Sequence, residues 1–120
     1  MQRGTRKHPE FKLEVVRRPE EGIALFVEGE LDIASVPELD GALAEAIDGA
    51  GGGAVLIDFH ACSFIDSTGL RSVIQGAQRL EERGRELGIC RASGPVQRAF
   101  ELTALDRSPG LLFREEEPFS

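Results

Sequence analysis

Residues 55–70 read Val-Leu-Ile-Asp-Phe-His-Ala-Cys-Ser-Phe-Ile-Asp-Ser-Thr-Gly-Leu, and this segment is the most informative part of the 120-residue chain about its architecture. Its first residues form an apolar run typical of a buried strand, and a polar loop is expected after Phe59. Phe64 and Ile65 anchor that loop, and the residues from Asp66 onward open an amphipathic helix. A strand that leads into a helix in this way favours an α/β architecture.

Hydrophobic patterns on both sides of this stretch extend the order of elements to β-β-α-β-α-β-α-β. Phe11, Leu13 and Val15 alternate with polar residues, which predicts a half-buried strand that pairs antiparallel with the next strand. The predicted strands cover residues 11–16, 23–27, 54–59, 87–90 and 111–113. The predicted helices begin at residues 35, 66 and 93, and their apolar positions cover residues 36–47, 70–80 and 96–103. The sequence therefore predicts one α/β domain, a mixed β-sheet of four to five strands with helices packed on it and right-handed crossovers.

The domain is expected to span residues 11–113. Residues 1–10 are polar with mixed charge, and a flexible N-terminus is expected there. Residues 114–120 read as an acidic C-terminal tail, which is expected to be loose. Where the first helix begins, Ser35 is the predicted N-cap residue and Glu38 completes a capping box with it.

Composition narrows the classes of function. A net charge of −7 and the absence of Trp and Tyr argue against nucleic-acid binding and against docking on anionic membranes. The acidity leaves open a partner with a basic surface. No signal peptide and no membrane-spanning apolar run is recognisable, so no membrane insertion and a cytoplasmic location are expected. Cys62, expected in the polar loop, and Cys90 lie far apart and are interpreted as packed, reduced thiols.

The predicted helix begins at Asp66, so the Asp66 carboxylate and the hydroxyls of Ser67 and Thr68 lie together at its N-terminus. One reading is structural, because either hydroxyl can cap the helix. The other reading is functional, because the same place suits a phosphoryl group. Capping needs one hydroxyl and two are present, and the site follows a predicted central strand. Gly69 is also expected to keep the first turn open to a partner.

Two other chemistries are open at this stage. A nucleophilic Ser67 needs a base, and the histidines are His8 and His60, the second expected in the loop after the strand. A cation site would need Asp32, Asp58 and Asp66 to converge. No G-x-S-x-G motif and no P-loop accompanies either possibility. Both are therefore weaker readings than a helix-start binding site.

Three motifs, in order and at matching spacing, resemble the STAS-domain family, specifically the bacterial anti-sigma-factor antagonists. The resemblance covers residues 11–113. The motifs are Gly29-Glu30-Leu31-Asp32, Phe64-Ile65-Asp66-Ser67-Thr68-Gly69-Leu70, and Val96-Gln97-Arg98-Ala99-Phe100 with Leu102-Thr103 following.

The resemblance implies a regulatory binding module that is not an enzyme and that uses no cofactor and no metal. In this family the unphosphorylated antagonist binds an anti-sigma factor, usually also a serine kinase, and binding releases the sigma factor. Phosphorylation of the serine after the Asp switches the antagonist off, and a serine phosphatase reverses the change. Matched by position, the acceptor is Ser67, and ATP is the ligand of the kinase.

The partner-binding residues implied by the resemblance are Asp32, Asp66, Ser67, Thr68 and Gly69. Arg71 departs from the family, in which many members carry Gly, and its guanidinium suits contact with a partner or with a phosphate on Ser67. Two alternatives stay open: a STAS scaffold subunit of a membrane lipid-transport complex, and a small serine hydrolase that uses Ser67.

Overall fold

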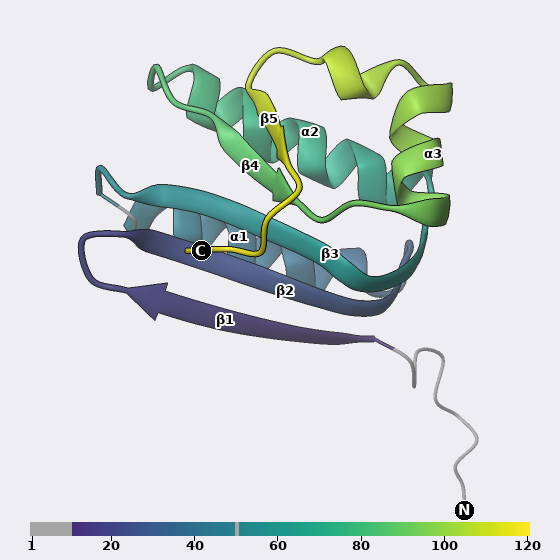
Figure 1. Ribbon diagram of the computed structural model, residues 1–120, viewed down its shortest axis with the longest axis horizontal. Coiled ribbons are helices and arrows are strands. Elements are labelled where there is room, and N and C mark those ends of the chain that lie inside the picture. Colours follow the sequence, from purple (N-terminus) through teal and green to yellow (C-terminus); the bar gives the residue numbers. More distant parts are fainter. Residues whose placement is uncertain (1–10, 50) are drawn as a thin grey trace, which may run out of the picture.

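The computed structural model describes residues 11–49 and 51–120, and Figure 1 shows their arrangement. The observed order is the predicted one, with one added 3₁₀ turn, η1. The elements are β1 (Lys12–Arg18), β2 (Gly22–Leu31), α1 (Val36–Gly49), β3 (Ala54–Ile65), α2 (Ser67–Glu81), β4 (Leu87–Cys90), α3 (Gly94–Leu102), η1 (Leu105–Arg107) and β5 (Leu111–Arg114). The predicted α/β fold with a mixed sheet is therefore confirmed; the expected flexible N-terminus, residues 1–10, lies outside the described residues.

The five strands lie in the sheet in their order along the chain, β1-β2-β3-β4-β5. β1 and β2 form an antiparallel hairpin, and every later pair is parallel. Each parallel connection moves one strand further in the same direction, so right-handed crossovers place their helices on the same face. Figure 1 shows α1 and α2 behind the sheet, which leaves an outer face that no helix of residues 11–49 and 51–120 covers. No helix in the described ranges is long and apolar enough to cross a membrane.

The core lies between the sheet and the helices. Leu25, Ile57 and Ile89 are register partners across β2, β3 and β4, and all three are fully buried. Side chains alternate between the two faces of a strand, so the neighbouring residues point to the outer face. Ala24, Leu56 and Cys90 form a second, smaller cluster there. Cys62 and Cys90 are both free and buried, as the sequence predicts.

Strand β3 is longer than predicted, which corrects the expected loop after Phe59. It continues to Ile65 because β2 pairs with it as far as Leu31, through two register shifts. β4 ends at Cys90 opposite Asp58, so beyond this point β3 gains pairing from β2 alone. His60, Ala61, Ser63 and Phe64 are exposed there. Polar side chains on a half-exposed strand mimic a loop in the sequence.

Residues 115–120, here called the C-terminal strap, are not loose, and that expectation is wrong. Figure 1 shows the strap, in yellow, crossing β3 toward β2 on the side away from α1. Pro118 is buried, and Phe119 packs against the cluster of Ala24, Leu56 and Cys90. The outer face is apolar at this point, and burying it accounts for the order of the strap.

Phe100 on α3 should be a main determinant of stability. Its fully buried ring meets Phe59 edge-on at 6.2 Å and Phe113 at 5.3 Å between centroids. Phe100→Ala is therefore expected to lower the free energy of unfolding by about 3–5 kcal/mol, measured by urea denaturation. Leu102 on the same helix is 80% exposed, so Leu102→Ala should change it by less than about 0.5 kcal/mol. Equal losses in the two variants would show that Phe100 is not in the core.

Candidate functional site

The ends of β2 and β3 bring two loops together. Leu31 and Ile65 are register partners, and the Asp66 amide donates to the Leu31 carbonyl at 3.1 Å. The segment that follows Leu31 and the start of α2 therefore lie side by side. Asp32 and Asp66, the two carboxylates predicted around the site, come from these two segments. This is the carboxyl-end edge of the parallel part of the sheet, where α/β folds place binding residues.

Asp66, and neither hydroxyl, caps α2. Its Oδ1 accepts a hydrogen bond from the Gly69 amide at 3.0 Å and from Thr68 Oγ1 at 2.6 Å. Burial disfavours the charged carboxylate, but these hydrogen bonds outweigh it and lower the pKa of Asp66. The Ile33 amide acts in the same direction, which links Asp66 to the neighbouring loop. The structural reading of Ser67 or Thr68 as the cap is therefore wrong.

Ser67 is the first residue of α2, and its side chain is exposed. Within the described chain, its hydroxyl makes no hydrogen bond. Thr68 differs, since it is partly buried and its hydroxyl donates to Asp66. The two adjacent hydroxyls thus have different roles: Thr68 supports the cap, and Ser67 is presented to solvent.

Gly69 does not open the first turn to a partner, so that expectation is wrong. It is buried, and a Cβ at this position would lie 2.8 Å from Ile65 Cγ1 and 3.0 Å from the Leu31 carbonyl oxygen. The missing side chain allows α2 to begin directly against the end of β2. Gly69 therefore positions the site from within and presents no surface to a partner.

Asp32 shapes the loop before α1. Its Oδ1 accepts from the Ala34 amide at 3.1 Å and from the Ser35 amide at 3.4 Å, a turn typical of aspartate. Ser35 precedes α1 as predicted, but its hydroxyl donates to the Glu30 carbonyl and accepts from the Asp32 amide. The predicted capping box is wrong in this respect, because the Ser35 hydroxyl bonds to the loop instead of the helix amides.

Arg71 lies one turn after Ser67 on α2 and is exposed. It borders two shallow hollows. One, of about 250 Å³, lies toward α1 and is also bordered by Ile33 and Thr68. The other, of about 410 Å³, lies toward η1 and is bordered by Ser67, Thr103 and Leu105. Arg71 thus lies between two depressions and Ser67 borders the second, and the surface that these two residues form on α2 is here called the ridge.

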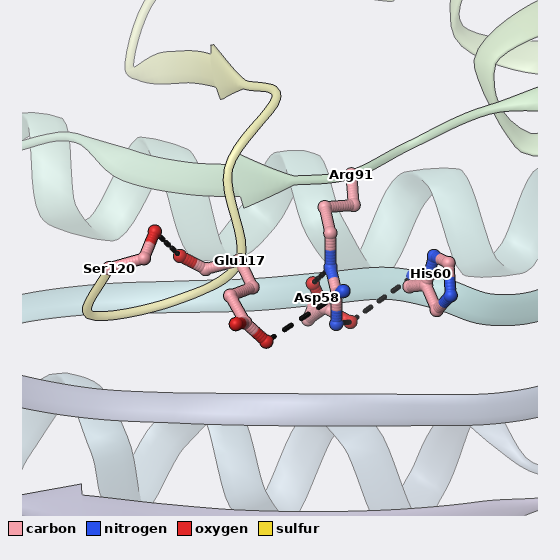
Figure 2. A network of polar contacts seen from close by, with 5 residues as sticks. All are labelled: Asp58, His60, Arg91, Glu117 and Ser120. Carbon is pink, nitrogen blue, oxygen red and sulfur yellow. Dashed lines mark hydrogen bonds and ion pairs between the residues drawn. The ribbon is translucent and has the colours of Figure 1, made fainter.

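Asp58 and His60 do not join this site. Asp58 faces the outer side of the sheet, where Arg91 Nε and Nη2 donate to its two oxygens at 2.8 and 3.1 Å (Figure 2). His60 borders a hollow with Asp58 and Arg91, and it borders neither hollow beside Ser67. The three aspartates therefore do not converge on a cation, and His60 is not placed as a base for Ser67. His8 lies outside the described residues.

Sequence reasoning missed the apolar and polar residues around the ridge. Ile33 is 73% exposed in the loop after β2, and Leu102 is 80% exposed at the end of α3. Thr103 and Leu105 follow Leu102 and border the hollow beside Ser67. Single exposed apolar residues are common on protein surfaces, so Ile33 and Leu102 add apolar area without defining a binding surface. In the sequence Ile33 belongs to no pattern, and Leu102 appears only in the third motif of the resemblance.

Comparison with known proteins identifies the family of the chain. The family model described as "Mlab, STAS domain" matches residues 14–113, and the chain belongs to the STAS-domain family. Within that family it groups with the anti-sigma-factor antagonists. The anti-sigma-B factor antagonist of Listeria monocytogenes is 33% identical over 95 residues, which is 79% of this chain and 82% of that protein.

Solved structures of antagonists share the fold. An anti-sigma factor antagonist from Mycobacterium paratuberculosis superposes with a TM-score of 0.72 at 24% identity, covering 84% of each chain. The phosphorylated form of the Bacillus cell fate determinant SpoIIAA superposes with a TM-score of 0.62 at 25% identity, over 88% of this chain and 92% of the other.

The Asp66 cap should contribute stability that depends on pH. Asp66→Ala removes the acceptor and is expected to cost about 1 kcal/mol of unfolding free energy at pH 7. Asp66→Asn keeps an acceptor and removes only the charge. The lowered pKa means that the contribution of the charge is complete above the ordinary aspartate value of about 3.9 and is lost as pH falls through the lower folded value. The difference between wild type and Asp66→Asn, followed by urea denaturation, should therefore shrink below about pH 4. A difference that stays constant to about pH 2 contradicts this account.

Two glycine substitutions should have opposite effects. Gly69→Ala places a methyl group against Ile65 and Leu31, and the resulting shift should cost about 1–3 kcal/mol. Gly41 lies within α1 and its Cβ position faces open space, so Gly41→Ala should stabilise the protein by up to about 1 kcal/mol. Thermal unfolding of the two variants measures these changes in stability. A harmless Gly69→Ala would mean that α2 is not in close contact with β2.

Proposed function

We propose that this protein is an anti-sigma-factor antagonist whose unphosphorylated form binds an anti-sigma factor with serine kinase activity and so releases the sigma factor. Phosphorylation of Ser67 by that kinase ends binding, and a serine phosphatase restores it. The observation that carries the proposal is the exposed Ser67 hydroxyl, which makes no hydrogen bond to the residues that the structure describes. The names of the similar proteins and the phosphorylated form of SpoIIAA support it.

The geometry favours Ser67 over Thr68 as the acceptor. A kinase must reach the hydroxyl and place it against the γ-phosphate in line for transfer. Thr68 Oγ1 is held by Asp66 at 2.6 Å, and its removal from that bond would disturb the cap. Ser67 needs no such rearrangement. The accepting residue and the capping residue are thus separate side chains.

The fold should tolerate a phosphate at this position. Phosphorylation adds roughly 1.5–2 negative charges, and a helix N-terminus favours anions. Arg71 is four residues further along α2, on the same side of the helix as Ser67. Its guanidinium can pair with the new phosphate, and it has no ion pair with another residue in the described ranges. The modification therefore leaves the domain folded.

The cost of the phosphate falls on binding. The partner surface comprises Ser67 and Arg71 on the ridge, with Asp32, Asp66, Thr68 and the exposed Ile33 around them. In a complex the phosphate would lie near the carboxylates of Asp66 and Asp32. Like-charge repulsion and desolvation there are worth a few kcal/mol, which corresponds to about a hundredfold in affinity.

Replacing Ser67 should separate binding from folding. Ser67→Asp is expected to weaken binding to the anti-sigma factor by about a hundredfold, while Ser67→Ala binds like wild type. Since Asp at a helix start is stabilising, the thermal midpoint of Ser67→Asp should not fall. Isothermal titration with the anti-sigma-factor kinase of the source genome, together with thermal unfolding, measures both. Equal affinity of Ser67→Asp and Ser67→Ala contradicts the electrostatic account.

Phosphate transfer itself is tested by intact mass after incubation with the same kinase and ATP. Wild type and Thr68→Ala should gain one phosphate, and Ser67→Ala should gain none. Loss of transfer in Thr68→Ala alone would identify the other hydroxyl. No mass change in wild type would favour the alternative of a scaffold subunit in a lipid-transport complex. Ester hydrolysis by wild type but not by Ser67→Ala would favour the hydrolase.

A further inference from the structure

On the outer face of the sheet, the C-terminal strap packs against residues other than those of the ridge at Ser67. The strap lies on this face and contacts the side chains of Arg91, which follows β4, and of Arg18, which ends β1. Arg91 Nη1 is 3.8 Å from Glu117 Oε2, and the Arg18 guanidinium lies 5.1 Å from the centroid of the Phe119 ring. Figure 2 shows Arg91 between Asp58 and Glu117, so one guanidinium joins the sheet to the strap.

The receiving surface has two parts that match the strap. The apolar part is the cluster of Ala24, Leu56 and Cys90, which Phe119 covers. The charged part consists of arginines from three strand ends, Arg18, Arg91 and Arg114, in a chain whose net charge is −7. The strap carries Glu115, Glu116 and Glu117, and Glu117 is the one that reaches Arg91. An acidic run followed by an aromatic ring thus meets a basic rim around an apolar floor.

Asp58 holds the Arg91 guanidinium in place independently of the strap. Asp58 is buried, its side chain only 3% exposed, and it accepts two hydrogen bonds from Arg91 in the fork geometry that arginine and carboxylate favour. Removal of the strap would leave this pair intact and its remaining nitrogen, Nη1, available to another carboxylate. The surface is therefore preorganised for an acidic ligand.

The strap itself is weakly attached. Its backbone makes no hydrogen bond to the sheet among the described residues, and Ser120 bonds back to the Glu117 carbonyl. Glu117 is 62% exposed, so water weakens its pairing with Arg91. Phe119 holds a left-handed backbone, φ 67°, which a bulky residue seldom adopts. Placing the Phe119 ring on the sheet therefore requires a strained backbone. A segment without that strain can compete with the strap for the same surface.

We propose that this outer face is a second binding surface, for an acidic segment of a partner polypeptide that carries an aromatic side chain, and that the strap occupies it as an internal competitor. The partner segment places a carboxylate on Arg91 and its ring on the floor of Ala24, Leu56 and Cys90. The surface is distinct from the ridge at Ser67, so its occupancy does not depend on the proposed function.

The test uses the full chain and a fluorescein-labelled peptide with the sequence of residues 114–120. A double variant, Glu117→Gln with Phe119→Ala, loosens the strap without shortening the protein. Because a competing strap lowers apparent affinity by the fraction of open sites, the peptide should bind the double variant at least about tenfold more tightly than wild type in an anisotropy titration. A peptide carrying the same two changes should not bind. Equal affinity for both proteins, or no binding to either, overturns the proposal.

The two buried cysteines report whether the strap opens or the domain unfolds. Cys90 lies beneath Phe119, whereas Cys62 belongs to the core on the helix side. In the double variant, alkylation of Cys90 should accelerate by about tenfold and that of Cys62 should not change. Added peptide should return the Cys90 rate to the wild-type value. If alkylation of Cys90 accelerates and the peptide does not slow it, the peptide does not bind over Cys90, and the proposed binding surface is overturned.

If both thiols react faster, the double variant is unfolding, and Glu117→Gln alone, which retains Phe119, replaces it in the titration. Equal peptide affinity for Glu117→Gln and wild type then overturns the proposal. The remaining possible occupant of the surface is the strap of a second copy of the protein. Light scattering of wild type at rising concentration tests for such a dimer. A dimer that disappears in the double variant would show that two copies exchange straps, and would overturn the assignment to a different partner.

Discussion

The hydrogen bond from the Asp66 amide to the Leu31 carbonyl is the contact on which the site depends. It joins the ends of two parallel strands that are far apart in the sequence. The approach is close because Gly69 has no side chain to separate α2 from Leu31 and Ile65. Once these ends meet, the Asp32 turn and the start of α2 have little freedom in how they lie. The geometry at Ser67 thus follows from backbone pairing in the sheet.

That pairing assigns different tasks to three adjacent polar residues. Asp66 satisfies the Gly69 amide, and Thr68 satisfies Asp66, so the requirements of the helix start are met within the motif. Ser67 is left with no structural task for its hydroxyl. A residue in that position can gain and lose a phosphate without loss of a cap. The phosphate proposed for Ser67 is therefore compatible with a stable fold, because the cap does not use that hydroxyl.

Much of the fold could be predicted from residue patterns, because alternation and helical spacing are local signals. The order of elements and the burial of Leu25, Ile57 and Ile89 follow from such patterns. The far end of β3 could not be predicted, since His60 and Ser63 are polar and their place in a strand depends on pairing with β2, some thirty residues away. The same holds for the burial of Gly69, because its surroundings come from Leu31.

The contacts of the charged strap could not be predicted from local sequence patterns either. Three glutamates in succession read as a solvated tail, and only the folded sheet brings Arg18, Arg91 and Arg114 from separate strand ends around one apolar cluster. The position of Ser67 in the candidate site was easier to predict, because Asp66, Ser67 and Thr68 are contiguous. Contacts made within a few residues are visible in a sequence, whereas contacts between distant elements require the register of the sheet.

The strand order also explains why an outer surface exists. From β2 to β5 each strand is added on the same side of the previous one, so right-handed crossovers place their helices on one face of the sheet. None of these crossover helices covers the outer face. Ala24, Leu56 and Cys90 nevertheless make that face apolar, and parallel strands are ordinarily covered on both sides. A six-residue strap covers less area than a helix and lacks backbone pairing to the sheet. Cover of this kind protects the face in the isolated protein and can still be displaced by a ligand of the same chemistry, which a packed helix would resist.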